Sequence, residues 1–506
     1  MGERVLVLGA GIAGLSVALA LGGSGRDVVI LERDPPPPEP AETGASVADH
    51  AFVEWRRSGV SHLRHSHAFL ARLYQLIRDH HPQLLQELAE AGCREIGFAT
   101  NLRPAMLAKY QPEPGDAALT TLMSRRTTLE LVMRRYAARQ PGIRFVPATK
   151  VLGLLLNRTG ETLTARGVVA EDAEGKRDWP ADIVIDAGGK NSHCLQWLRE
   201  AGATIEGEDA PAGILYFTRH YRLLDGVSEP QRGTVPGAGD LGYLKYGLFP
   251  ADNRWFSITL AVPEVETGLR RAVLQPEAFD TICASLPGIA RWVAPETAEP
   301  QTKVFGMGQL FSRWHHYVRQ GRPAVLNFFA IGDAAIRTNP LYGRGCTFAA
   351  IEAQLLREML DAGADPVGRA IRFDRAVAHA LRPFYDAMVK FDADAIRRAA
   401  QAVDPDHRPS LRARLAKSFT EDAIGPAIRG EIRLMRAYMR AFHMIEPPSA
   451  WLKRPRNAAT ILRYWLRPKA AKAELYLPRL GPDRTDLLAQ LGLPLSVEQA
   501  PLDTAA

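Results

Sequence analysis

A glycine-rich turn near the start of the chain constrains the fold more than any other feature. Residues 5–8 form an unbroken apolar run, as a parallel strand covered on both faces requires. Gly9, Gly11 and Gly14 follow with the spacing GxGxxG, where a helical pattern begins. Such glycines allow a sharp turn, a close approach of a pyrophosphate and tight packing of strand and helix, and the helix N-terminus offers free amides. Glu32, after the next apolar run, supplies a carboxylate for ribose hydroxyls. The chain is therefore predicted to bind a dinucleotide, either FAD or NAD.

A second segment with paired glycines favours one of these cofactors. An apolar run ends at Gly332 and Asp333, a loop carries Pro340, and a helical pattern begins near Gly343 and Gly345. Asp333 could accept a hydrogen bond from a sugar-like chain such as the ribityl group of a flavin. The glycines would let a planar ring lie against the helix N-terminus, whose dipole favours negative charge on a reduced ring. These residues predict FAD, the alternative being that the glycines serve only the turn.

Length and composition bound the architecture. The chain has 506 residues, of which 46% are hydrophobic and 24% charged, enough for a sizeable core and two or three structural units. We find no apolar stretch long enough for a membrane span and no secretory signal, so a cytoplasmic location is expected. The 4 cysteines are scattered, as expected for free thiols in a reducing compartment.

The pattern of elements predicts an α/β fold. We expect a Rossmann-like FAD-binding domain of the glutathione-reductase type, an inserted antiparallel-sheet substrate domain and a C-terminal helical region. One helix is expected over residues 68–91, despite Pro82, because apolar residues recur at helical spacing. The expected boundaries are 1–67, 121–190 and 303–362 for the FAD-binding domain, 68–120 and 191–302 for the substrate domain, and 363–506 for the helical region.

Together these motifs resemble the para-hydroxybenzoate hydroxylase superfamily of FAD-dependent monooxygenases, and most closely its squalene-epoxidase and polyether-epoxidase branch. The resemblance covers residues 1–360 and includes a middle motif, ADIVIDAGGKNSHCLQWLREAG. The residues of this motif that match the family are Asp182, Asp186, Gly189 and Ser192. Those that depart from the family's usual pattern are Gly188, Lys190 and His193.

The resemblance also implies further contacts to FAD. Arg126, three residues before a Leu-Glu pair, would reach the FAD phosphates, with Arg125 as its close rival. Val151 stands where family members use a backbone contact to adenine, and Cys346 is expected to be a packed thiol whose backbone faces the flavin. The full expected set of FAD-binding residues is Gly9, Gly11, Ala13, Gly14, Glu32, Arg33, Arg126, Val151, Asp333, Pro340, Gly343, Gly345 and Cys346.

A histidine-rich segment, VSHLRHSHAFLARL, contains His62, Arg64, His65 and His67. No carboxylate lies in this run and flavin chemistry needs no metal, so we assign no metal site. The resemblance implies that Arg64 and His67 contact the flavin or the substrate; the alternative is that both lie on a helix surface.

The resemblance implies a reaction in which reduced flavin takes up O2, and the resulting C4a-hydroperoxide gives one oxygen atom to an electron-rich substrate. The protein then supplies orientation and a dry pocket, and no catalytic side chain is assigned. We expect an FAD-dependent monooxygenase, an epoxidase or a hydroxylase, acting on an apolar organic substrate in secondary, lipid, isoprenoid or polyketide metabolism. NAD(P)H, or a separate flavin reductase, would supply electrons.

Other functions remain open. An FAD-dependent dehydrogenase, reductase or oxidase without oxygen insertion is the main alternative. A flavin halogenase is less favoured because its WxWxIP stretch is absent from the sequence. A non-enzymatic FAD-binding protein is the last possibility.

Charge and aromatic residues suggest two surfaces. The net charge of +7 gives a pI near 9.2, but it is spread along the chain, so a nucleic-acid partner is not expected. Basic residues concentrate among apolar ones in residues 428–472, which indicates either a solvated helical face or peripheral contact with anionic lipid. The aromatic residues that could line an apolar substrate pocket, or form only core, are Tyr216, Phe217, Tyr243, Phe249 and Phe256.

Overall fold

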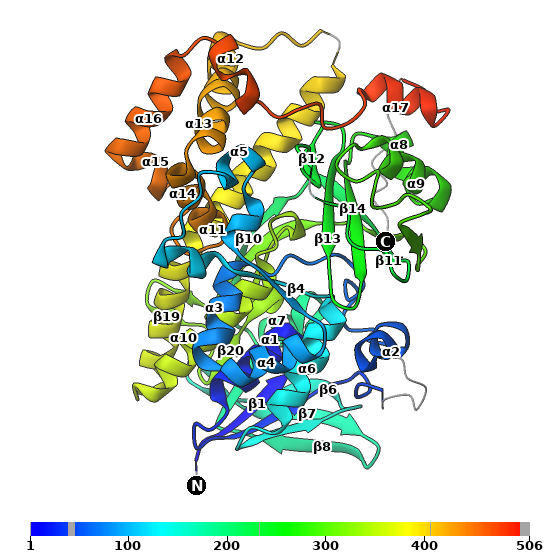
Figure 1. The fold of residues 1–506 in the computed structure, drawn as a ribbon. Coiled ribbons are helices and arrows are strands. Elements are labelled where there is room, and N and C mark those ends of the chain that lie inside the picture. Colours follow the sequence, from blue (N-terminus) through cyan, green and yellow to red (C-terminus); the bar gives the residue numbers. More distant parts are fainter. Residues whose placement is uncertain (1, 39–45, 232, 405, 496–506) are drawn as a thin grey trace. The chain divides into compact units, whose positions relative to one another are not determined.

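The computed structural model describes residues 2–38, 46–231, 233–404 and 406–495 (Figure 1). Residue contacts divide the chain into two compact units, each made of three segments. Unit 1 comprises Met1–Arg94, Ser124–Pro211 and Phe311–Val389, and unit 2 comprises Glu95–Met123, Ala212–Leu310 and Lys390–Ala506. These boundaries differ from the expected domains, since residues 68–94 and 191–211 group with the nucleotide-binding segments and the C-terminal helical region is divided after residue 389. Residues 496–506 of that region lie outside the described part.

Unit 1 is built on a parallel sheet of five strands in the order β20-β9-β1-β2-β5. The strands are β1 (Arg4–Leu8), β2 (Asp27–Leu31), β5 (Ile143–Val146), β9 (Ile183–Asp186) and β20 (Phe328–Ala330). In the central strand β1, Val5, Leu6 and Val7 are buried, as the apolar run predicts for a strand with both faces covered. The predicted α/β class with a Rossmann-like sheet is confirmed.

Helices cover this sheet. α1 (Ile12–Leu21) packs against α10 (Gly345–Asp361) and α6 (Arg126–Ala138). The expectation of a single helix over residues 68–91 is wrong, because the structure has α3 (Ala71–His80) and α4 (Pro82–Glu90). Pro82 lacks an amide hydrogen and stands at the first position of α4, where no intrahelical donor is needed, so it starts a new helix.

In the sequence, Phe348, Ile351, Leu355 and Met359 recur at helical spacing and predict one packed face of α10, but the buried face observed differs from it. Phe348 and Met359 are buried as expected, but Ile351 and Leu355 are only partly buried. Glu352 is instead fully buried, and its carboxyl accepts a 2.7 Å hydrogen bond from the backbone amide of Gly332. Burial raises the pKa of Glu352 well above its usual value, and its hydrogen bond with Gly332 fixes the turn after β20.

Small antiparallel sheets complete unit 1: a hairpin of β18 (Val318–Arg319) and β19 (Arg322–Pro323), and two sheets of three strands each. One contains β6 (Lys150–Thr159), β7 (Thr162–Asp172) and β8 (Gly175–Pro180). The other contains β10 (Glu206–Pro211), β17 (Phe311–His316) and β21 (Ile336–Arg337). The apolar pattern of residues 143–185 predicts a strand-rich stretch, and β5 to β9 confirm it.

Unit 2 contains the predicted antiparallel sheet, in the order β12-β13-β14-β11-β15, with β16 also paired to β11. Its strands are β11 (Ile214–Leu223), β12 (Ala238–Asp240), β13 (Lys245–Pro250), β14 (Trp255–Pro263), β15 (Ala298–Pro300) and β16 (Phe305–Met307). Phe217, Tyr243 and Phe256 belong to one buried core, with residues of α8 (Thr267–Ala272), α9 (Pro276–Ser285) and α17 (Arg484–Gln490). Core packing thus accounts for these three aromatic side chains.

The described part of the chain after residue 363 is mostly helical, as expected. Its remaining helices are α11 (Pro366–Val403), α12 (Leu411–Ser418), α13 (Gly425–Gly430), α14 (Ile432–Phe442), α15 (Ala450–Lys453) and α16 (Pro455–Leu466). Among the described residues, none of the helices combines the length and the apolar character of a membrane span.

Candidate cofactor site

The opening turn has the geometry that a pyrophosphate needs. Gly9 has a φ of +101°, and a Cβ there would lie 2.8 Å from the Ala187 carbonyl oxygen. A Cβ on Gly14 would lie 1.9 Å from the carbonyl oxygen of Gly9, so the helix can pack this closely only because Gly14 has no side chain. Gly11 borders open space, and no side chain caps the N-terminus of α1, where Ala13 lies in the first turn. The uncapped amides and the open side of Gly11 therefore fit an anionic phosphate group.

Glu32 lies directly beside this turn, at the carboxyl end of β2. Its side chain is buried and accepts hydrogen bonds from the amide of Ala10 at 2.7 Å and the amide of Asp34 at 3.0 Å. A carboxylate has about four acceptor positions, so it can still accept hydrogen bonds from ribose hydroxyls. The neighbouring Arg33 is exposed. The position and acceptor capacity of Glu32 fit the role expected from its spacing.

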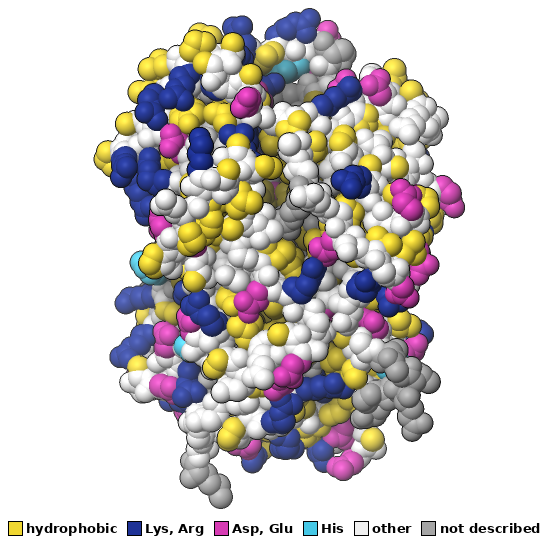
Figure 2. Space-filling model, viewed as in Figure 1, with side chains coloured by type: hydrophobic (Ala, Val, Ile, Leu, Met, Phe, Trp, Pro, Cys, Tyr) yellow, Lys and Arg dark blue, Asp and Glu magenta, His cyan; other side chains and the backbone are white. Residues whose placement is uncertain are grey.

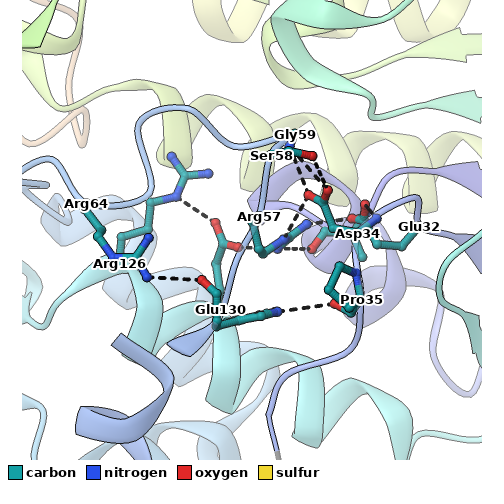
Figure 3. Close-up of polar contacts among 11 residues, drawn as sticks. Glu32, Asp34, Pro35, Arg57, Ser58, Gly59, Arg64, Arg126 and Glu130 are labelled. Atoms are coloured by element: carbon teal, nitrogen blue, oxygen red, sulfur yellow. Dashed lines mark hydrogen bonds and ion pairs between the residues drawn. The ribbon is translucent and has the colours of Figure 1, made fainter. Parts of the chain in front are cut away.

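Arg57, which no sequence motif identifies, lies at the centre of the buried polar contacts (Figure 3). Its guanidinium donates a 2.6 Å hydrogen bond to Glu32 and another of 2.6 Å to Glu130, and it also donates to the carbonyl of Ala10 at 3.0 Å. Oδ2 of Asp34 lies 3.7 Å from Nε of Arg57. Arg57 thus neutralises two buried carboxylates, one directly after β2 and one in α6. Only the tertiary structure identifies it, because its spacing from Glu130 in the sequence gives no signal.

Glu130 extends this buried network to Arg126 and His67. Arg126 donates a 2.6 Å hydrogen bond to the second carboxylate oxygen of Glu130 and lies 3.1 Å from Nε2 of His67. Burial disfavours the charged form of Arg126, but the nearby Glu130 carboxylate raises its pKa above the usual value. Because arginine only donates, Nε2 of His67 must accept, so Nδ1 carries the proton and donates to the carbonyl of His65 at 2.9 Å. His67 is thus held as one neutral tautomer.

The rival arginine and Arg64 have other partners. Arg125 is the N-cap residue of α6, forms an ion pair with Asp49 and stacks on the ring of Phe52 at 5.1 Å. Arg64 donates to three backbone carbonyls at the end of α2 (Val47–Glu54), at 2.9–3.2 Å. The contacts of Arg64 are those of a helix-capping side chain. Of Arg126 and its rival Arg125, it is Arg126 that shares the buried network with Glu32.

The expected flavin-ring residues gather where β20 ends and α10 begins. Gly332 has a φ of +64°, and Asp333 follows it. Burial raises the pKa of Asp333, although the positive charges of Arg337, Arg126 and Lys190 oppose this. Asp333 is therefore a carboxyl group near a cluster of cationic side chains, and it can exchange hydrogen bonds with hydroxyls of a bound sugar chain.

Gly343 joins the turn before α10 to the histidine-rich segment. Its φ is +62°, and a Cβ there would lie 3.0 Å from the Ala68 carbonyl oxygen. The short 3₁₀ turn that starts at Pro340 ends at Gly343, and α10 then begins at Gly345 without a side-chain cap. The free amides of this helix N-terminus fit an electron-rich edge of a planar ring.

Cys346 in the first turn of α10 is a buried thiol. Burial raises its pKa to about 11, a shift that the nearby Arg126 charge opposes. The thiol is therefore protonated near neutral pH and is a poor nucleophile. A buried, protonated thiol is compatible with a packing role.

The remaining histidines of the segment are neutral as well. Burial lowers the pKa of His62 well below its usual value and lowers that of His65 to about 4. Among the described residues, no group of three histidine, cysteine, aspartate or glutamate side chains could hold a metal ion.

Val151 lies close to the adenosine end of the expected site. It is in β6, and the amide of Thr149, two residues earlier, donates a 2.9 Å hydrogen bond to the backbone carbonyl of Glu32. A backbone contact from Val151 to an adenine bound beside Glu32 is therefore compatible with the fold.

These residues fit FAD in two respects: an uncapped helix follows an open glycine turn, and a second uncapped helix follows Asp333. Comparison with known proteins agrees, since residues 4–214 match the model of the FAD binding domain family. The fold and this domain define the class of protein: the chain is an FAD-dependent oxidoreductase.

Two curated mycobacterial proteins are similar to the chain. Protein Rv3254 of Mycobacterium tuberculosis (strain ATCC 25618 / H37Rv) is 25% identical over 95% of this chain and 98% of its own length. Menaquinone reductase of Mycolicibacterium smegmatis (strain ATCC 700084 / mc(2)155) is 25% identical over 71% of this chain and 76% of its own length.

Solved structures share the fold at low sequence identity. p-Nitrophenol 4-monooxygenase PnpA from Pseudomonas putida DLL-E4 has 17% identity and a TM-score of 0.53, over 88% of this chain and 98% of its own. A triple mutant of the flavin-dependent brominase Bmp2 has 16% identity and a TM-score of 0.54, over 91% of this chain and 98% of its own. The resemblance to the squalene-epoxidase branch finds no support among these relatives.

Proposed function

We propose that the chain is an FAD-dependent monooxygenase that transfers one oxygen atom from O2 to an apolar organic substrate. The observation that carries this proposal is the character of the groups around the start of α10. His67 is a neutral tautomer, the Cys346 thiol has a pKa of about 11, and His65 has a pKa of about 4. None of these three is an ionised nucleophile near neutral pH, so the reaction is left to the cofactor and the protein positions it.

Bound FAD would supply electron transfer and the activation of O2. The chain's own residues would act around it: the amides of α1 and Arg126 bind phosphate, and Glu32 orients the ribose. Asp333 holds the ribityl hydroxyls, and the N-terminus of α10 stabilises negative charge on the reduced ring. NAD(P)H is the proposed reductant, with a separate flavin reductase as the alternative source.

Labelled dioxygen tests the proposal directly. Purified protein with FAD and NADH or NADPH is incubated under ¹⁸O2 with a panel of apolar alkenes and phenols. We expect a product whose mass increases by one labelled oxygen; an epoxide from an alkene and a catechol or quinol from a phenol separate the two forms of the reaction. Turnover of substrate without label in the product would contradict a monooxygenase.

A reductase without oxygen insertion is a second candidate, favoured by the similarity to a menaquinone reductase. Such an enzyme would convert its substrate under anaerobic conditions, with one equivalent of reductant consumed per product. The same panel includes a quinone with an isoprenoid side chain under argon for this reason. A halide requirement for product formation would instead indicate halogenation.

A further inference from the structure

The C-terminal helices carry more positive charge than the rest of the chain. Residues 408–477 contain 15 Lys and Arg and only 5 Asp and Glu, a net charge of +10. Because the whole chain has a net charge of +7, all other residues together sum to −3. The basic character of the protein is thus confined to these helices of unit 2, where Figure 2 shows Lys and Arg side chains gathered with hydrophobic ones.

Helix α16 presents an apolar stripe on its exposed side. Its buried side packs into the core of the helical segment through Ile461 and Tyr464. Leu462 and Leu466, four residues apart on the opposite side, are 48% and 77% exposed. Pro455 and Ala459 are also exposed and fall on the same side by helical geometry. A surface helix in water normally shows the reverse pattern, with polar residues outward.

Arginines flank this stripe along one edge. Arg456, Arg463 and Arg467 are exposed and recur at spacings of seven and four residues, which aligns them along one side of the helix. Nη2 of Arg463 lies 3.1 Å from Oε1 of Glu431. Arg456 forms no ion pair with any described residue, and Arg467 stacks on Tyr464 at 4.6 Å. An apolar stripe with a basic edge is the pattern of a helix that lies in a membrane interface.

A cavity at the N-terminus of α16 adds a site for an anion. It has a volume of about 340 Å³, and Arg433, Arg454 and Arg456 contribute to its wall. Arg454 occupies the N-cap position without a capping side chain, so two arginines lie at the positive end of the helix dipole. Among the described residues, Arg433 donates hydrogen bonds to the uncharged side chains of Asn457 and Thr460.

The cavity wall also contains carboxylates, but they are too few to balance its arginines. Glu446 is shared between Arg440 and Arg454, with hydrogen bonds of 2.7 Å to each. Asp116 and Glu113 bind Arg436. The twelve residues of the wall include five arginines and three carboxylates, so a phosphate group would relieve the repulsion.

We propose that α16 is a docking surface for an anionic phospholipid bilayer. Leu462 and Leu466 enter the interface, the basic edge binds lipid phosphates, and the cavity beside Arg456 accepts one headgroup phosphate. A soluble phosphate compound would match the arginines but would leave the apolar stripe in water. The lipid surface satisfies both features, so it is the occupant that the structure favours. This inference does not depend on the reaction proposed above.

Vesicle flotation with the full-length, FAD-loaded protein tests the proposal. Vesicles of phosphatidylcholine alone are compared with vesicles containing one quarter phosphatidylglycerol, at increasing NaCl. We expect binding to the anionic vesicles that weakens as salt rises. The double variant Leu462→Ser/Leu466→Ser and the triple variant Arg456→Gln/Arg463→Gln/Arg467→Gln should each bind about tenfold more weakly or worse. Leu274→Ser, at a position 46% exposed and outside these helices, is the matched control and should bind like the parent protein.

Three outcomes would overturn the proposal. Equal binding of parent and α16 variants, with an unchanged flavin spectrum and near-UV circular dichroism, would show that this face does not meet lipid. Release from vesicles by low-millimolar inorganic phosphate, beyond the effect of NaCl at equal ionic strength, would assign the cavity to a soluble anion. A dimer of the parent protein in sedimentation velocity without lipid, reduced to a monomer by the leucine variant, would assign the stripe to self-association.

Discussion

The guanidinium of Arg57 donates a 2.6 Å hydrogen bond to Glu32, the carboxylate expected to hold the adenosine ribose. The same side chain bonds to Glu130 at 2.6 Å, and all three side chains are almost completely buried. Glu130 in turn binds Arg126, which contacts His67. The two ends of the expected FAD site are thus connected by one buried chain of charged groups.

Replacing Arg57 by Gln should strongly destabilise the protein. The substitution leaves Glu32 and Glu130 buried without their shared cation, and breaking a buried pair in this way costs about 3–5 kcal/mol. Urea unfolding of the parent and the variant measures the loss. Arg56→Gln, at the exposed neighbouring arginine, is the control and should change the free energy of unfolding by less than about 0.5 kcal/mol. Equal stability of the two variants would contradict the role assigned to Arg57.

Replacing Gly343 by Ala should weaken FAD binding more than replacing Gly363 by Ala. Both Gly343 and Gly363 have positive φ values, +62° and +59°, but only at Gly343 would the new Cβ meet another group, the Ala68 carbonyl oxygen at 3.0 Å. Gly363→Ala should therefore show only the backbone penalty, about 1–2 kcal/mol. Gly343→Ala should carry the same backbone penalty and should also displace the turn before α10. Fluorescence titration with FAD, with the stability of both variants measured in parallel, separates the two effects; identical FAD affinities would be inconsistent with a cofactor role for this turn.

His65 should make the protein less stable in mild acid. Burial lowers its pKa in the folded protein to about 4, whereas the ordinary value of 6.5 applies when the chain unfolds. The unfolded chain therefore binds the proton first as pH falls. The stabilising contribution is complete above pH 6.5 and is lost as the pH falls toward 4, by about 3 kcal/mol. His65→Gln should flatten the decline in the free energy of unfolding over this range, and the control His80→Gln, at an exposed position, should not.

Cys346 predicts the opposite pH dependence in alkali. Its pKa in the folded protein is about 11, against an ordinary value of 9.0, so the folded state retains the proton longer than the unfolded state. Stability from this group is complete below pH 9 and is lost as the pH rises through 11, by about 3 kcal/mol. Cys346→Ser removes the titrating group and should reduce the slope. Rapid alkylation of Cys346 at pH 8 in the folded protein would show that the thiol is neither buried nor protonated as described.

Local sequence patterns predict the parts of the site whose geometry depends on only a few consecutive residues. The turn from Gly9 to Gly14 and the segment after Gly332 follow from glycine spacing, because each requires a positive φ or a close backbone approach within a few residues. The buried parallel strands β1 and β2 follow from their continuous apolar runs. These features need no knowledge of distant residues.

Contacts between distant segments could not be predicted in this way. Arg57, which follows α2, and Glu130 meet because α6 packs against α2, and no local pattern records this. Helical spacing alone also led to two wrong predictions. Pro82 divides the expected helix, and Glu352 lies on the buried face of α10 where apolar residues were expected. In the second case a hydrogen bond from the backbone amide of Gly332 offsets part of the cost of burying a polar group.

The strand order of unit 1 bears on how the protein is made. β1, β2, β5 and β9 leave the ribosome early, but β20, which pairs with β9, is synthesised only after the whole antiparallel sheet of unit 2. Until then the nascent nucleotide-binding sheet presents β9 as an unprotected apolar edge, open to association with other chains. Polypeptides that stop before Phe328 should therefore aggregate, and chaperone dependence should end once translation passes that strand.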